Sequence, residues 1–263
     1  MILLYKSWLE MRVRLAFGLG AISALCLVTI WDYQKLTHNV ARDKMMLMLL
    51  PFTQQAIDSV TANYSSFIWA HWNAFNQLLL LPMLAMTIAS AGILPNGACL
   101  RERGDQNSAA AAFMLSLPVR RHTLLLYRGA IGLLALAIFA FVPQLMIVAL
   151  SPLVSAAYSF QDALAYGAIS FAAMLIPYAL GLVVSSLIDD DMTSRLSSIF
   201  FLIALLILER TINPSQPFAY YRFLSGEAYF TTHEILWIGM AACTLLAAAI
   251  TWAAIQIVER RDY

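Results

Sequence analysis

Long apolar runs separated by short polar segments dominate the chain, and this pattern predicts membrane-spanning helices. A helix needs roughly 20 residues to cross the hydrocarbon core of a bilayer. The expected spans are at about residues 15–31, 67–94, 129–150, 163–188, 196–208 and 234–258. The fifth is short, and the fourth contains Pro177, which neighbouring helices must accommodate. The pattern therefore predicts an all-α integral membrane protein with six transmembrane helices, forming one domain over residues 1–263.

Residues 2–14 precede the first span and show a helical period of their own. The apolar positions are Leu4, Trp8, Met11 and Leu15, and the polar positions are Lys6, Glu10 and Arg14. Each set follows one face of a helix, so we predict an N-terminal amphipathic interfacial helix. The alternative is that these residues simply extend the first membrane helix into the cytoplasm.

Residues 100–128 form a long polar and basic break between two apolar runs. The basic residues are Arg101, Arg103, Arg120, Arg121 and Arg128, against the acidic residues Glu102 and Asp105. An excess of Lys and Arg beside membrane segments places a loop in the cytoplasm. Within this loop, residues 106–117 are rich in alanine and predict a short helix that ends at Pro118.

Alternation from this loop places both termini in the cytoplasm. The inner segments then carry Lys6, Arg12, Arg14, Arg101, Arg103, Arg120, Arg121, Arg128, Arg195, Arg260 and Arg261. The outer segments carry Lys35, Arg42, Lys44, Arg210 and Arg222. The larger basic inventory on the inside favours this orientation over the reverse.

Two outer segments separate the spans. Residues 32–66 form a polar outer loop whose apolar stretch, residues 45–52, is too short to cross a bilayer. Residues 209–233 form an outer segment rich in Phe and Tyr, which is typical of backbone at headgroup level or dipping shallowly below it.

Composition agrees with a membrane location. Hydrophobic residues make up 61% of the chain, charged residues make up 12%, and the mean hydropathy is +0.74, values that a water-soluble domain of this size does not reach. The net charge of +1 gives no nucleic-acid footprint. Cys26, Cys99 and Cys243 lack disulfide or metal-ligand spacing and are expected to pack in apolar surroundings.

The predicted spans contain no charged residue or histidine near their centres. This argues against a proton-coupled carrier, which would keep such a residue despite a cost of about 2.5 to 3.5 kcal/mol. The four histidines are scattered without HExxH spacing, which argues against an intramembrane metalloprotease. No GxxxxGK[ST] phosphate loop is present, so any ATP must be bound by another chain.

Three further features each allow two interpretations. Met45, Met46 and Met48 could offer sulfur to copper, but methionines in an apolar run are more typical of packing. The aromatic residues of 218–230 could stack on a substrate or form a headgroup belt. Residues 189–191 are three aspartates that could hold a divalent ion or form a solvated turn.

Several features together resemble the type-2 ATP-binding cassette (ABC) permeases. They are the N-terminal interfacial helix, the six spans, the Arg101-Glu102-Arg103 run after the second span, the sequence Ser116-Leu117-Pro118-Val119 with Arg120 and Arg121, and the Arg-Arg-Asp terminus. The architectural resemblance covers the whole chain, whereas the motif is confined to about residues 101–128.

The resemblance implies a permease subunit that pairs with a second copy of itself or a close relative and binds two separate ABC ATPase subunits. Residues 100–128 would be the cytoplasmic coupling loop, with the helix before Pro118 as the coupling helix. Glu102, Arg103, Arg120 and Arg121 would then lie near the ATPase surface. Taken without the resemblance, these charges either dock a partner or only orient the protein during insertion.

We therefore expect a permease subunit of an ABC exporter in the inner membrane, working by alternating access. This chain would carry no enzyme activity, cofactor or metal of its own, and ATP and magnesium would bind the partner subunit. The uncharged spans favour a hydrophobic or amphipathic cargo such as a lipid, drug or peptide. The alternative is a non-transporting membrane scaffold or assembly factor that docks a cytosolic protein.

Overall fold

The computed structural model describes residues 12, 15–24, 26–28, 81, 83–86, 121–154, 158–187, 191–212, 220–226, 229 and 235–260. The named elements are α7 (Arg121–Leu150), η2 (Ser151–Val154), α8 (Phe160–Leu187), α9 (Asp191–Ile212), α10 (Tyr220–Ser225) and α12 (Trp237–Arg260). A shorter apolar helix covers Leu15–Val28. No strand occurs among the described residues, so the predicted all-α class is confirmed for this part of the chain.

Three of the described helices are long and apolar enough to cross a membrane. Their apolar stretches are Gly129–Leu153, Phe160–Leu187 and Trp237–Ile257, which coincide with the third, fourth and sixth predicted spans. These helices are compatible with a membrane protein. The first predicted span corresponds to the shorter helix Leu15–Val28, and α9 covers the fifth. The second lies largely outside the described residues, so the total of six remains a prediction.

Helices α7 and α9 extend by several residues beyond the spans that the apolar pattern predicts. Helix α7 begins at Arg121, before the expected start at Gly129, and α9 runs through 22 residues from Asp191 to Ile212 rather than over 196–208. A hydrophobicity pattern marks where a helix meets lipid, whereas the backbone hydrogen bonds continue through charged residues until a cap or breaker ends them.

Helix α8 begins at Phe160 rather than at the predicted Ala163 because Ser159 caps it. The Ser159 hydroxyl accepts a 3.0 Å hydrogen bond from the backbone N–H of Asp162, and the Ser159 carbonyl accepts one of 3.1 Å from Ala163. This is the N-cap arrangement in which a serine oxygen satisfies a free N–H of the first turn. Because of this cap, Asp162 lies in the first turn of α8, where a negative charge interacts favourably with the positive end of the helix dipole.

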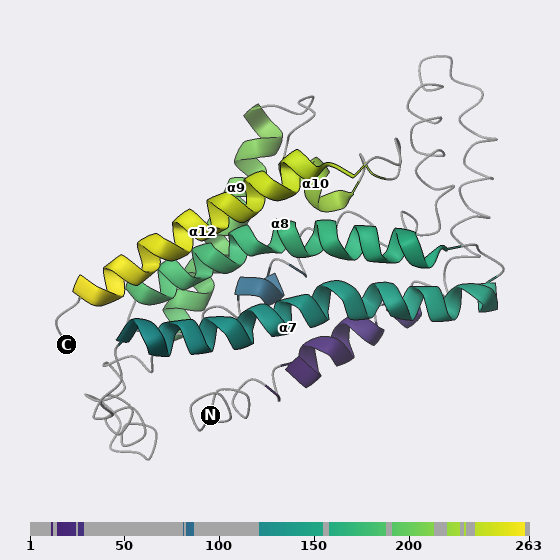
Figure 1. Cartoon of the computed structure of the whole chain (residues 1–263), viewed down its shortest axis with the longest axis horizontal. Helices are drawn as coiled ribbons and strands as arrows, with labels where there is room; N and C mark the ends of the chain where they lie inside the picture. Colours follow the sequence, from purple (N-terminus) through teal and green to yellow (C-terminus); the bar gives the residue numbers. More distant parts are fainter. Residues whose placement is uncertain are drawn as a thin grey trace.

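Helix α8 is the centre of the bundle. It lies between α7 and α12, and α9 and α10 also pack on it (Figure 1). In its most apolar window, 67% of the residues are buried, against 39% in α7 and 11% in α12. Helix α12 therefore turns most of its surface outward, including the large side chains of Trp237, Ile238, Leu245 and Trp252.

Helices α7 and α8 form an antiparallel hairpin joined through η2, as the short polar segment between the two runs predicts (Figure 1). The start of α7 and the ends of α8 and α12 lie at the same end of the bundle (Figure 1). The basic residues Arg121 and Arg260, at the start of α7 and the end of α12, are therefore on one side. This relative placement agrees with the predicted alternation of the spans.

Two apolar clusters hold the helices together. One joins the Leu15–Val28 helix, α7 and α8 around Phe139, Leu136 and Tyr178. The other joins α8, α10 and α12 around Ile169, Phe223 and Cys243. Cys26 and Cys243 are buried within these apolar clusters, which confirms the expected packing role for these two cysteines. Cys99, the outer loop 32–66 and most of the loop 100–128 lie outside the described residues.

Candidate functional site

The predicted ATPase-docking residues fall mainly outside the described part of the chain. Glu102, Arg103, Pro118 and Arg120 are not described, and Arg121 is the first residue of α7. The helix continues without a break from Arg121 to Leu150, with Pro143 near its far end. The end of the basic loop is therefore part of the same rigid helix as the third predicted span.

Helix α7 is locked to α8 close to this basic end. The hydroxyl of Tyr178 donates a 2.9 Å hydrogen bond to the carbonyl oxygen of Gly129. A Cβ on Gly132 would lie 2.9 Å from Cε2 and Cζ of Tyr178, closer than carbon atoms normally approach. The two helices can come this near because residue 132 has no side chain. Helices α7 and α8 are therefore in direct contact near Gly129 and Gly132.

Polar side chains gather at the opposite end of the hairpin, near the start of α8. The Tyr158 hydroxyl donates a 3.1 Å hydrogen bond to Oε1 of Gln144. The Tyr229 hydroxyl donates one of 2.8 Å to Oδ1 of Asp162. Gln144 is only 1% exposed although it lies on an apolar helix, so the tyrosine meets a polar group that water does not reach.

These contacts change the acidity of both tyrosines. Burial, the hydrogen bond to Asp162 and the Asp162 charge together raise the pKa of Tyr229 from 10.0 to about 12. Burial raises the pKa of Tyr158 above its ordinary value, and the nearby Tyr166, Asp162 and Tyr229 add to this shift. Both side chains therefore stay protonated as donors throughout the physiological range.

The aromatic segment folds back onto α8. The Tyr220 hydroxyl on α10 donates a 2.9 Å hydrogen bond to the carbonyl oxygen of Ala173, in the middle of α8. Tyr229, nine positions later, reaches Asp162 in the first turn of the same helix. The two contact points are eleven residues apart along α8, which corresponds to about 16 Å of helix. Tyr220 and Tyr229 thus contact α8 at two points along its first half, and the depth of this segment in a bilayer remains a prediction.

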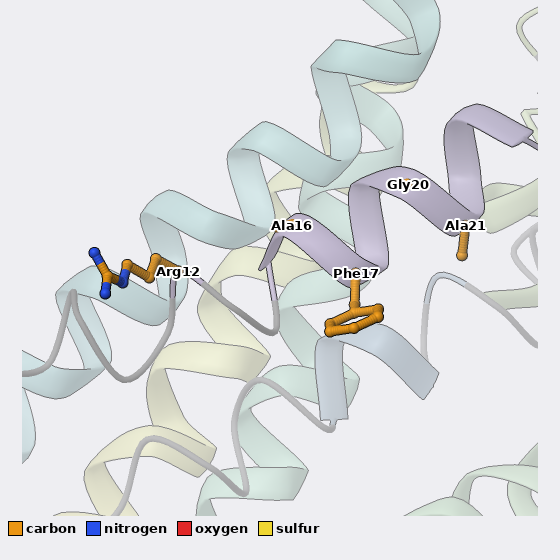
Figure 2. Close-up of a pocket in the computed structure, with 5 residues that line it drawn as sticks. All are labelled: Arg12, Ala16, Phe17, Gly20 and Ala21. Atoms are coloured by element: carbon orange, nitrogen blue, oxygen red, sulfur yellow. The ribbon is translucent and has the colours of Figure 1, made fainter.

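An open pocket of about 750 Å³ lies along the Leu15–Val28 helix. Its lining residues are Arg12, Ala16, Phe17, Gly20 and Ala21. Phe17 and Ala21 project from the same side of the helix, whereas Arg12 reaches outward at the N-terminal end (Figure 2). Among the described residues, the pocket therefore has one cationic end and an otherwise apolar lining.

Among the described residues no group of three or more His, Cys, Asp or Glu side chains could hold a metal ion. Asp191, one of the three consecutive aspartates, opens α9, and its neighbours 189 and 190 are outside the described part. The methionines of 45–52 are also outside it.

Sequence reasoning did not single out the contacts of Gln144, Tyr158 and Asp162. Gln144 is an uncharged polar residue in an apolar run, and this was the one available signal. Its partner could not be found from the pattern because Tyr158 lies beyond the turn. The Arg12 pocket had no signal beyond the small residues at 16, 20 and 21.

No protein-family model matches this chain, and neither does any curated protein or solved structure.

Proposed function

We propose that the chain is the transmembrane permease subunit of an ABC exporter of the type-2 class. Separate ATPase subunits bind ATP and magnesium, and a second permease copy or close relative completes the pathway. The protein sits in the inner membrane with both termini in the cytoplasm. The proposal is carried by one observation: α7 is a single helix from Arg121, at the end of the basic loop, to Leu150.

The mechanism follows from this rigid connection. An ATPase that closes on ATP presses on the coupling loop 100–128 and moves the Arg121 end of α7. Because Tyr178 holds α8 against Gly129 and Gly132, α8 moves with α7. Helices α10 and α12 pack on α8, so the tilt spreads through the bundle. A path between two protomers then opens to the outside.

The cargo is hydrophobic or amphipathic. The described polar residues inside the bundle, such as Gln144 and Ser170, are uncharged. A pathway for a naked ion needs charged or closely spaced carbonyl ligands. An uncharged lining suits a lipid, a drug or an apolar peptide, which leaves water without charge desolvation.

Co-purification tests the proposal. The full chain, tagged at its C-terminus and extracted in mild detergent from its native cells, is expected to bring down a nucleotide-binding protein in near-equal amounts. The doubly substituted chain Arg120→Glu with Arg121→Glu is expected to lose that protein, because two charges at the docking surface are reversed.

The matched control is Arg222→Glu, which reverses a charge on α10 in the predicted outer segment and is expected to keep the ATPase. Consistent absence of any ATPase from the wild-type preparation overturns the proposal and favours the scaffold. An ATPase that remains bound and fully coupled after both arginines are reversed overturns the docking assignment.

A further inference from the structure

The pocket beside Arg12 combines features that the proposed transport cycle does not use. Ala16, Gly20 and Ala21 form a low floor, and the exposed ring of Phe17 stands beside it (Figure 2). A Cβ placed on Gly20 would meet no atom within 4 Å, so space remains open above the backbone. The volume of about 750 Å³ is in the range of pockets that bind small molecules.

The opposite face of the same helix explains why this pocket stays uncovered by α7. Gly18 faces Phe139 of α7, and a Cβ on Gly18 would lie 2.6 Å from the ring atom Cζ. Ile22 and Cys26 are buried on this side within the cluster that includes α7. One face of the helix thus packs against α7, and the face that carries Arg12 is exposed.

The positive charge of Arg12 favours a ligand that carries a negative charge. Arg12 is exposed, and no residue of the described part forms an ion pair with it. It stands at the N-terminal end of an apolar helix, where a long basic side chain reaches the membrane interface. The phosphate of a lipid lies at this depth, and a guanidinium binds phosphate with two parallel hydrogen bonds. From Ala16 to Ala21 the helix advances about 7.5 Å, which leaves an apolar surface for part of an acyl chain.

We propose that this pocket binds an anionic phospholipid, with its phosphate on Arg12 and an acyl chain along Ala16, Gly20 and Ala21. The site recognises the combination of a negative headgroup and an adjoining chain. The acyl chain of a zwitterionic lipid can occupy the same apolar surface, but the positive group of its headgroup is repelled by Arg12. This site does not depend on the transport proposal, since it requires only a helix beside lipid.

Native mass spectrometry of the purified full-length chain in detergent tests the site. The probes are dioleoyl phosphatidylglycerol and dioleoyl phosphatidylcholine, which share the same acyl chains. We expect the wild-type protein to bind the anionic lipid about fivefold more tightly, the factor given by one interfacial basic residue. Arg12→Gln is expected to remove this preference, and Arg12→Lys is expected to keep most of it. Gly20→Leu fills the floor and is expected to weaken binding of both lipids.

Two control variants and one soluble probe separate the explanations. Arg195→Gln removes a positive charge from α9, and Ala24→Leu introduces the same leucine side chain on the exposed face outside the pocket lining. Both are expected to bind the lipids like the wild type. Glycerol phosphate, which has the anion without the chains, is expected not to compete.

Equal binding of the two lipids by the wild type overturns the proposal, as does an unchanged preference in Arg12→Gln. Full competition by glycerol phosphate would also overturn the proposal, because it would show that the site binds an anion without needing the acyl chains. A dimer mass that Gly20→Leu abolishes, without bound lipid, assigns the small residues to a contact between two copies instead.

Discussion

The hydroxyl of Tyr220 donates a 2.9 Å hydrogen bond to the carbonyl oxygen of Ala173, the carbonyl that would pair with the N–H of residue 177 in a regular helix. Residue 177 is proline and has no N–H to give. Pro177 in α8 thus leaves one backbone carbonyl without its helical donor, and Tyr220 of α10 supplies a hydrogen bond to that carbonyl. The contact explains how a proline is tolerated inside the most buried helix of the bundle.

Replacing Tyr220 by Phe should leave the Ala173 carbonyl without this donor. We expect a loss of about 1 to 3 kcal/mol in the free energy of unfolding, the usual cost of stranding one buried polar group. The measurement is reversible unfolding in mixed micelles of mild detergent and dodecyl sulfate, followed by helical circular dichroism.

A double-mutant cycle isolates the role of Pro177. Pro177→Ala restores an N–H that can bond to the Ala173 carbonyl within α8. In that background Tyr220→Phe should have much less effect, with a coupling energy of about 1 kcal/mol between the two sites. An equal loss in both backgrounds would show that Tyr220 acts through packing instead.

The close crossing of α7 and α8 predicts a different response at two neighbouring glycines. Gly132→Ala would place a methyl carbon 2.9 Å from Cε2 of Tyr178, so we expect about 1 to 3 kcal/mol of destabilisation from overpacking. Gly129→Ala is the matched control, because its Cβ would lie 3.9 Å from the Tyr178 hydroxyl, an ordinary contact. The same unfolding assay applies, and a cost at 129 as large as that at 132 would contradict the crossing.

The bond between Tyr229 and Asp162 predicts a loss of stability at alkaline pH. The folded protein raises the pKa of Tyr229 from 10.0 to about 12, so folding favours the protonated phenol. The resulting stabilisation is complete below pH 10 and disappears as the pH rises through 12. Thermal unfolding of the purified protein between pH 9 and pH 12 should therefore show a steeper decline for the wild type than for Tyr229→Phe.

Asp162→Asn provides the comparison for this effect. The amide carries no charge, so the part of the pKa shift caused by the Asp162 carboxylate is removed; the decline should still begin near pH 10 but should be smaller and end at a lower pH. Tyr158 also has a raised pKa for which Asp162 is one cause, so Tyr158→Phe must be measured alongside. Identical pH profiles for the wild type and Tyr229→Phe would rule out this contribution.

The hydrophobic pattern was enough to locate the three described helices that are long and apolar enough to cross a membrane. The apolar run at 129–150 lies inside the observed α7, and the run at 163–188 agrees with α8 to within three residues at either end. Length and polarity are properties of the local sequence, so they can be read from it directly. The helix start at Phe160 was missed because the effect of Ser159 depends on cap geometry.

Apart from the hairpin of α7 and α8, which helices touch each other could not be read from the same pattern. In a membrane the lipid is as apolar as the side chains, so packing depends on shape and on single polar contacts rather than on hydrophobicity. The contacts of Gly132 with Tyr178 and of Gly239 with Phe223 are of this kind. The folding of Tyr220 onto Ala173 is another, since its cause, Pro177, lies in a different element.

The continuous helix α7, which runs from Arg121 through its apolar stretch, gives the sharpest test of the proposed coupling mechanism. Leu125→Pro would remove the N–H donor to the carbonyl of residue 121 and bend α7 between its basic end and its apolar part, at a local cost of about 3 kcal/mol. A cysteine at Leu145, which is 41% exposed farther along α7, reports movement of that part in a chain whose native cysteines are replaced by alanine. With ATPase subunits bound, adding ATP should change the labelling rate of this cysteine, and Leu125→Pro should abolish the change while the ATPase still co-purifies. Leu125→Ala keeps the helix and should preserve the response to ATP. If the response survives the proline, force reaches the bundle by a route other than α7.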